Sequence, residues 1–249
     1  MFEHSKLFPQ QRQRLQQLVE RGVLPALEAW ARSMTAPIWW KGQAGLAPYQ
    51  GGTVCFVHTG IRVLGVTAEH VHRKAVEHSA QEWCQVGAHT FDPVKRCIDA
   101  DPTLDICTYD FTEVSTNAAG ADIHYAQKWP PSVADGDPAL ACGWPWELSE
   151  TSGAHATHSF LHFLCRIQQS SPSQLGIATF TSTSVPWGSI PLPQGTNLGG
   201  MSGGPVFRIV EAPLSQLHLV GIIHQYQPNL ELILARPLSL INADGTIIR

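Results

Sequence analysis

The chain has 249 residues, of which 43% are hydrophobic and 14% charged, and its formal net charge is −4. This composition can bury a sizeable core, which excludes a largely disordered chain, and the lack of a long basic run argues against nucleic acid as the main partner. No window is apolar enough to span a membrane, and the first residues lack an apolar leader, so we expect no secretory signal, no membrane partner and a cytoplasmic protein.

The chain opens on a helical pattern. Between residues 9 and 33, hydrophobic residues recur at spacings of about three and four, with polar residues between them; they are Leu15, Leu18, Val19, Leu24, Leu27 and Trp30. Gly22 and Pro25 are expected to split this segment into two helices. We therefore predict an N-terminal helical extension over residues 1–38, which either packs against the following domain or binds a regulatory partner.

From Gly51 onward the pattern changes to the period of two that is typical of β-strands. Residues 53–57 and 61–66, joined by a turn at 58–60, predict a hairpin. Further strands are expected at 83–86, 94–98 and 105–111, so residues 39–112 would form a first β-barrel. Residues 113–139 are rich in Ala, Asp, Gly and Pro, and we interpret them as a linker to a second barrel.

The second half of the chain, residues 140–249, also has strand patterns. Strands are predicted at 160–167, 176–182, 205–210, 217–224 and 230–235. Between them, residues 146–157 are mostly polar or small, which is typical of a loop. The sequence therefore predicts an all-β protein in two parts behind a helical extension.

A serine between glycines is the most informative feature of this second half. Residues 198–207 read LGGMSGGPVF, so Ser202 lies among small residues directly before an apolar run. Glycines at 200, 203 and 204 allow a tight turn that brings backbone N–H groups close to a bound carbonyl. Taken alone, the segment fits a glycine-rich β-turn before a strand as well as it fits the loop of a reactive serine.

Two further residues fit a serine that acts as a nucleophile, because such a serine needs a base to take its proton and a carboxylate to orient the base. His70 lies at the end of a strand pattern that runs over residues 63–71, and Asp105 comes directly before the apolar run at 106–109. Asp99 and Asp101 compete with Asp105. We prefer Asp105, because Asp101 precedes a proline that would interrupt a strand.

In this order, His70, Asp105 and Ser202 with their neighbours resemble the histidine, aspartate and serine motifs of the trypsin/chymotrypsin-like serine peptidases. The segment at 141–145, ACGWP, resembles an element that bacterial relatives carry early in their second barrel. The resemblance covers roughly residues 40–240 and implies two six-stranded antiparallel β-barrels of the chymotrypsin-like type. It also implies a serine endopeptidase that acts on protein or peptide substrates without a cofactor, with the backbone N–H groups of Gly200 and Ser202 as the oxyanion hole.

The resemblance further assigns the substrate pocket to Thr196, His224 and Tyr226. Relatives that cleave after Lys or Arg carry aspartate at the position of Thr196, so a basic side chain is not the expected preference. His224 is open to three interpretations, which are contact with substrate, support of Asp105 and a structural role. Met201 stands where many secreted relatives carry an aspartate, so activation through a newly cleaved N-terminus is not expected.

Disulfides and metals are not expected. Val71 and Leu198 occupy positions at which secreted relatives carry half-cystines, which favours free thiols for all six cysteines. The pairs His70 with His72 and His158 with His162 have spacings that could ligate a metal, but no Cys or carboxylate pair completes a zinc signature.

Two other functions stay open at this point. One is a catalytically silent pseudoprotease that holds a peptide in its cleft. The other is a hydrolase of esters or other acyl groups, because the chemistry of acyl transfer is the same.

Overall fold

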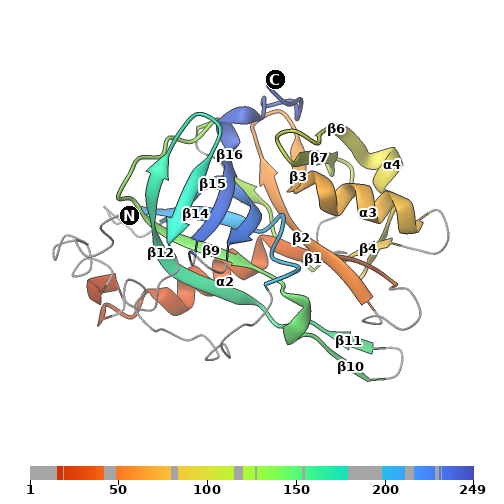
Figure 1. Cartoon of the computed structure of the whole chain (residues 1–249), viewed down its shortest axis with the longest axis horizontal. Coiled ribbons are helices and arrows are strands. Elements are labelled where there is room, and N and C mark those ends of the chain that lie inside the picture. Colours follow the sequence, from red (N-terminus) through yellow and green to blue (C-terminus); the bar gives the residue numbers. More distant parts are fainter. Residues whose placement is uncertain are drawn as a thin grey trace.

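The computed structural model consists of two β-sheets that lie side by side, with a helix of the N-terminal segment running beneath them (Figure 1). The structure describes residues 16–18, 20–41, 49–79, 84–114, 120–126, 128–152, 155–178, 198–210, 216–227, 230 and 232–249. The prediction of an all-β protein with barrel-type antiparallel sheets and a helical extension is confirmed.

The N-terminal segment packs on the sheets. Helical residues at 16–18 and 20 are followed by a turn at Gly22, where φ is +66°, and by helix α2, Leu24–Ser33. Gly22 thus separates two helical stretches as expected, because glycine tolerates a positive φ. The buried side of α2, which includes Leu24 and Leu27, belongs to one apolar cluster with Phe207 and Leu217 of the second sheet.

The first sheet is an open half-barrel in which strands run in the order β5-β4-β1-β2-β3-β7-β6, with β8 added to β2 in parallel. Its strands are β1 Thr35–Lys41, β2 Tyr49–His58, β3 Val63–Thr67, β4 Cys84–Val86, β5 His89–Phe91, β6 Cys97–Asp101, β7 Ile106–Asp110 and β8 His124–Tyr125. β2 and β3 form the predicted hairpin, with Cys55 opposite Val66.

The second sheet closes into a six-stranded barrel in the order β12-β13-β16-β15-β14-β9. Its strands are β9 Pro138–Gly143, β12 Leu161–Ser170, β13 Leu175–Ala178, β14 Pro205–Val210, β15 Gln216–Gln227 and β16 Leu232–Pro237. Short 3-10 helices η2, Trp146–Leu148, and η4, Leu238–Leu240, lie at its ends. Closure satisfies the backbone hydrogen bonds that an edge strand would leave open.

Three local expectations are wrong. The strand expected at 94–98 is a short helix, α4 Pro93–Arg96, followed by β6, because the Asp92 carboxylate accepts hydrogen bonds from the Val94 and Lys95 N–H groups and caps a helix. The loop expected at 146–157 contains η2 and a hairpin of β10 Glu150–Ser152 and β11 His155–Thr157. The strand expected at 63–71 ends at Thr67, and from Glu69 the chain forms helix α3, Glu69–Ser79.

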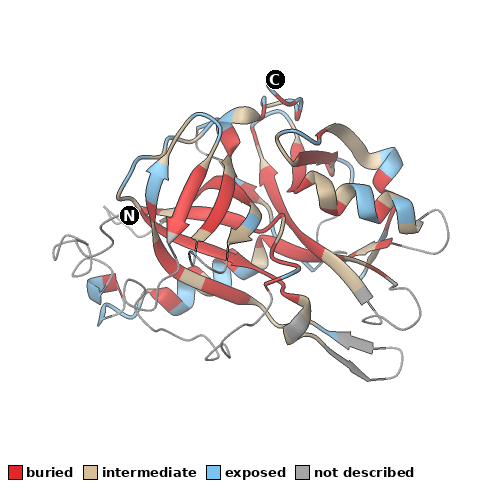
Figure 2. Ribbon diagram, viewed as in Figure 1, coloured by how far each residue is buried: buried red, intermediate tan, exposed pale blue. Residues whose placement is uncertain are grey.

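The core joins the two sheets. Figure 2 shows buried residues along the strands of both sheets, and one cluster combines Leu24 of α2, Val66 of β3 and Phe207 of β14. The sheets therefore share apolar contacts along the boundary between them, and loops from both meet there.

Candidate active site

His70 lies in the first turn of α3, just after β3 ends at Thr67. The Asp105 carboxylate lies 2.9 and 3.0 Å from Nδ1 of the ring, and its Oδ1 also accepts the backbone N–H of His70 at 2.9 Å. The two side chains are 31% and 20% exposed. A carboxylate that holds Nδ1 in this way leaves Nε2 of a neutral ring as the proton acceptor.

Asp105 occupies a turn and not the first position of a strand, since β7 begins at Ile106. Its φ is +54°, a left-handed conformation that aspartate tolerates better than most residues. The turn is closed by Asp101, whose Oδ1 accepts the N–H groups of Thr103 and Leu104, each at 2.8 Å. Burial alone would raise the pKa of Asp105, but the hydrogen bonds from the ring and backbone of His70 hold that pKa below its usual value.

Asp99 and Asp101, the competing carboxylates, face the C-terminus of the chain. Arg249 pairs with Asp99 at 2.7 Å and with Asp101 at 3.1 Å, and Asp99 also accepts the backbone N–H of Ile247. Of the three acids, the structure therefore brings Asp105 to His70.

His224, on β15, approaches the same carboxylate. Its Nδ1 lies 3.8 Å from Oδ2 of Asp105, and its side chain is 9% exposed. Burial, together with the nearby Arg236 charge, lowers the pKa of His224 to about 4, so the ring is neutral at pH 7. The 3.8 Å separation is longer than a hydrogen bond, so the ring lies beside Asp105 without bonding to it. Tyr226 is half-buried against the core of the second barrel, and Thr196 lies outside the described residues.

The loop around Ser202 is held between the two sheets. Gly200 and Gly203 have φ values of +98° and +85°, which glycine adopts without strain. The Gly203 N–H donates to the Ile223 carbonyl at 2.7 Å, next to His224 on β15. On the other side, Thr53 of β2 donates its backbone N–H to the Ser202 carbonyl and its hydroxyl to the Gly200 carbonyl, each at 2.8 Å.

The contact of Thr53 with the serine loop is not predicted from the sequence. Thr53 lies 147 residues before Gly200, and a buried threonine in a strand carries no local signal of such a contact.

The histidine and serine motifs meet at Gly52 of β2. A Cβ atom at Gly52 would come within 2.7 Å of the Val71 side chain and 2.9 Å of the Ser202 carbonyl oxygen. The start of α3 and the serine loop therefore pack against the same residue.

Within the described residues, no hydrogen bond joins the His70 and Ser202 side chains, and the N–H groups of Gly200 and Ser202 have no acceptor.

The histidine spacings that suggested a metal are not realised. On α3, His70 and His72 are about 200° apart around the helix axis, so they face different groups; His72 contacts Tyr109 and not Asp105. His158 bonds Ser149, and His162 faces Glu28.

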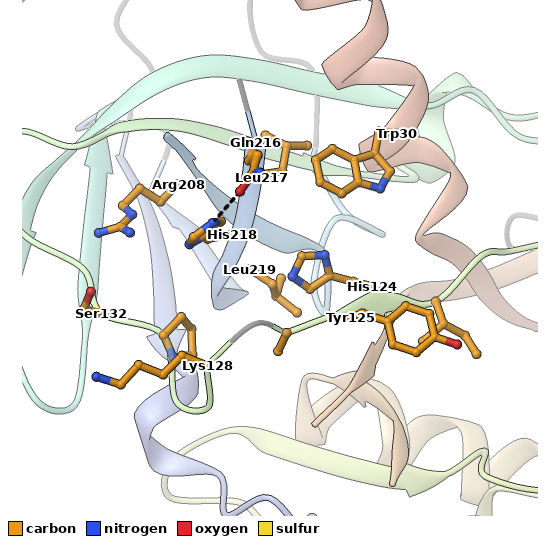
Figure 3. A pocket seen from close by; sticks show the side chains of 13 residues that line it. Trp30, His124, Tyr125, Lys128, Ser132, Arg208, Gln216, Leu217, His218 and Leu219 are labelled. Carbon is orange, nitrogen blue, oxygen red and sulfur yellow. Dashed lines mark hydrogen bonds between the residues drawn. The ribbon is translucent and has the colours of Figure 1, made fainter. Parts of the chain in front are cut away.

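A separate cavity of about 420 Å³ lies between α2, β8, the second half of β14 and the first residues of β15. Figure 3 shows Trp30 and His124 on one side of it and Arg208 and Lys128 on the other. None of His70, Asp105 and Ser202 lines this cavity. The site built from the sequence motifs is thus distinct from this cavity.

The described helices include none with the length and hydrophobicity that a bilayer-spanning segment needs.

No family model and no curated protein matches the sequence. In structure, the chain is similar to a solved protein described as HBP at atomic resolution, with 13% identity, a TM-score of 0.49, and coverage of 86% of this chain and 88% of that one.

Proposed function

We propose that this protein is a serine endopeptidase in which Ser202 is the nucleophile, His70 the general base and Asp105 the carboxylate that orients it. The observation that carries the proposal is the double contact of Asp105 with Nδ1 and with the backbone N–H of His70. Because this contact orients the ring and stabilises the imidazolium, Nε2 is free to accept a proton. The family resemblance of the three motifs supplies the role of Ser202.

In the proposed reaction, Ser202 Oγ attacks the carbonyl carbon of the scissile peptide bond while His70 Nε2 takes the hydroxyl proton. The tetrahedral oxyanion is stabilised by the N–H groups of Gly200 and Ser202, which have no acceptor among the described residues. His70 then passes the proton to the leaving amine, and water hydrolyses the acyl-enzyme by the same route in reverse. A bond between base and nucleophile is often long in an unliganded enzyme and shortens when substrate binds.

The enzyme is proposed to be active once folded, without cleavage of a propeptide. Met201 is 2% exposed and packs in the core of the second barrel, so it takes no part in an ion pair with a new N-terminus. We also propose that the protein acts in the cytoplasm on protein or peptide substrates, and that any regulatory partner binds the N-terminal helices.

A fluorophosphonate probe tests this function, because it labels only a serine that a base activates. We expect labelling of the wild type and none of Ser202→Ala or His70→Ala. Ser239→Ala, which changes an exposed serine on η4, is the matched control and should be labelled like the wild type. Labelling that persists in Ser202→Ala would exclude Ser202 as the nucleophile.

The second candidate is a pseudoprotease that binds a peptide without cleaving it. The observation in its favour is that the His70 and Ser202 side chains are not hydrogen-bonded. A folded wild-type protein that the probe does not label, and that still binds peptides, would support this function over the first.

A further inference from the structure

Three side chains of the kinds that bind metal ions converge from three elements, namely helix α3 and two strands of the first sheet. They are His72 of α3, Cys97 of β6 and Cys107 of β7. One ligand atom of each lies within 4.8 Å of the other two, and the Cys97 and Cys107 sulfur atoms are 3.9 Å apart. The sequence does not predict this group, because gaps of 25 and 10 residues follow no zinc signature.

The pairing of β6 with β7 explains why the two thiols face each other. Cys97 lies opposite Tyr109, and Tyr109 shares a face of β7 with Cys107, two residues away. A register shift between Cys97 and Asp99 adjusts the strand at this point. The Tyr109 hydroxyl lies 3.0 Å from Nδ1 of His72, so α3 is attached to the same face.

The spacing of the sulfur atoms suits a tetrahedral ion. With a zinc–sulfur distance of about 2.3 Å and tetrahedral angles, two thiolates on one Zn²⁺ lie about 3.8 Å apart. The observed 3.9 Å agrees with that value. A disulfide would instead require a sulfur–sulfur distance of about 2.05 Å.

We propose that His72, Cys97 and Cys107 form a binding site for one Zn²⁺ ion. Cys107 is fully buried, whereas Cys97 and His72 are partly exposed, so an ion can enter from their side and keep a water molecule as its fourth ligand. The Tyr109 hydroxyl fixes the His72 ring through Nδ1, in the way that second-shell groups hold metal-bound histidines.

Such an ion would cross-link the segments that carry the candidate catalytic pair. His72 follows His70 by two residues on α3, and Cys107 follows Asp105 by two residues at the start of β7. The ion would therefore hold the first turn of α3 against β6 and β7, which is a structural role separate from acyl transfer. The proposal does not depend on peptidase activity.

Cobalt titration of the reduced, chelator-treated full chain tests the site. Co²⁺ bound by thiolates produces a charge-transfer absorption, and we expect it to saturate at one equivalent and to be reversed by Zn²⁺. Cys97→Ser and Cys107→Ser should abolish the absorption, and His72→Gln should weaken binding at least tenfold. The matched controls Cys84→Ser and Cys165→Ser, at buried thiols outside the group, should retain it.

Two further measurements keep the result clear if the buried Cys107 variant fails to fold. Zn²⁺ should raise the melting temperature of the wild type but not of Cys97→Ser, which changes a partly exposed residue. Ser202→Ala should bind Co²⁺ like the wild type, which separates this site from the proposed peptidase function. Absorption that survives both cysteine variants would overturn the proposal, as would a Cys97–Cys107 disulfide formed in place of metal binding.

Discussion

Asp105 holds His70 twice, through the ring at 2.9 Å and through the backbone N–H at 2.9 Å. The backbone contact fixes the position of the carboxylate at the start of α3, and the ring contact fixes the orientation of the imidazole. A neutral His224, 3.8 Å from the same carboxylate, lies on the barrel side. One carboxylate thus contacts elements of both sheets.

Asp105→Asn should reduce turnover on a peptide substrate by about 10⁴-fold while leaving the fold intact. An asparagine amide stabilises the wrong tautomer of His70, and asparagine tolerates the φ of +54° as well as aspartate does. Measured with the same substrate, Asp99→Asn and Asp101→Asn should change turnover little, because both acids face Arg249. The amide oxygen that replaces the Asp101 carboxylate can still accept the N–H groups of Thr103 and Leu104 and so keep the turn closed. A large loss of turnover in either control, with Asp105→Asn near wild type, would reassign the orienting acid.

Gly203→Ala should prevent the serine loop from docking. A Cβ atom there would come within 2.0 Å of the Thr53 carbonyl and 2.1 Å of the Thr67 hydroxyl, so we expect a loss of roughly 3 kcal/mol or more in the free energy of unfolding, and loss of probe labelling. Urea unfolding measures the first and fluorophosphonate the second.

Gly60→Ala is the matched control for this change. Gly60 also has a positive φ, +98°, but a Cβ atom there meets nothing within 4 Å. It should cost only the strain of a left-handed alanine, about 1–2 kcal/mol, and keep full labelling. Equal costs for the two variants would show that the contacts at Gly203 do not matter.

Acid should destabilise the protein between about pH 6.5 and pH 4. Burial lowers the pKa of both His124 and His224 to about 4, from 6.5 in the unfolded chain. Between these pKa values the unfolded state binds protons that the folded state does not. The contribution of neutral His124 and His224 to the free energy of unfolding is therefore complete above pH 6.5 and is lost as the pH falls toward 4. Each histidine contributes up to about 1.4 kcal/mol per pH unit.

His124→Gln isolates one part of this effect. The difference in unfolding free energy between pH 7.5 and pH 5, measured with urea, should be smaller in the variant than in the wild type, because His124 no longer titrates. Any loss of packing against Trp30 and Phe207 affects both pH values alike and cancels in the difference. An unchanged difference would contradict the assignment to His124.

Cleavage should not favour Lys or Arg, because the family resemblance places the neutral Thr196 where peptidases with that preference carry an aspartate. Profiling the wild type on a peptide library measures this, with Ser202→Ala as the blank. A strong preference for basic residues would mean that an acid from another part of the chain reaches the pocket.

Features that depend on neighbouring residues could be predicted from the amino-acid sequence. The period of two predicted the β2–β3 hairpin and most strands of the barrel, and Gly22 predicted the break in the N-terminal helices, because alternation and a missing Cβ act within a few residues. The resemblance of three short motifs, in their chain order, to those of a known family also made His70, Asp105 and Ser202 candidates. It failed at α4, where the Asp92 carboxylate caps a helix in a segment of strand-like composition.

Which of these residues meet depends on how the elements pack in the fold. Three aspartates within seven positions look alike in sequence, and the turn that Asp101 closes directs Asp105 to His70 while Arg249 occupies the other two. The contact of Thr53 with the serine loop and the grouping of His72 with Cys97 and Cys107 arise in the same way, from strand register and from the packing of α3 on the sheet. Contacts between residues so far apart along the chain depend on the packing of whole elements, which no local pattern encodes.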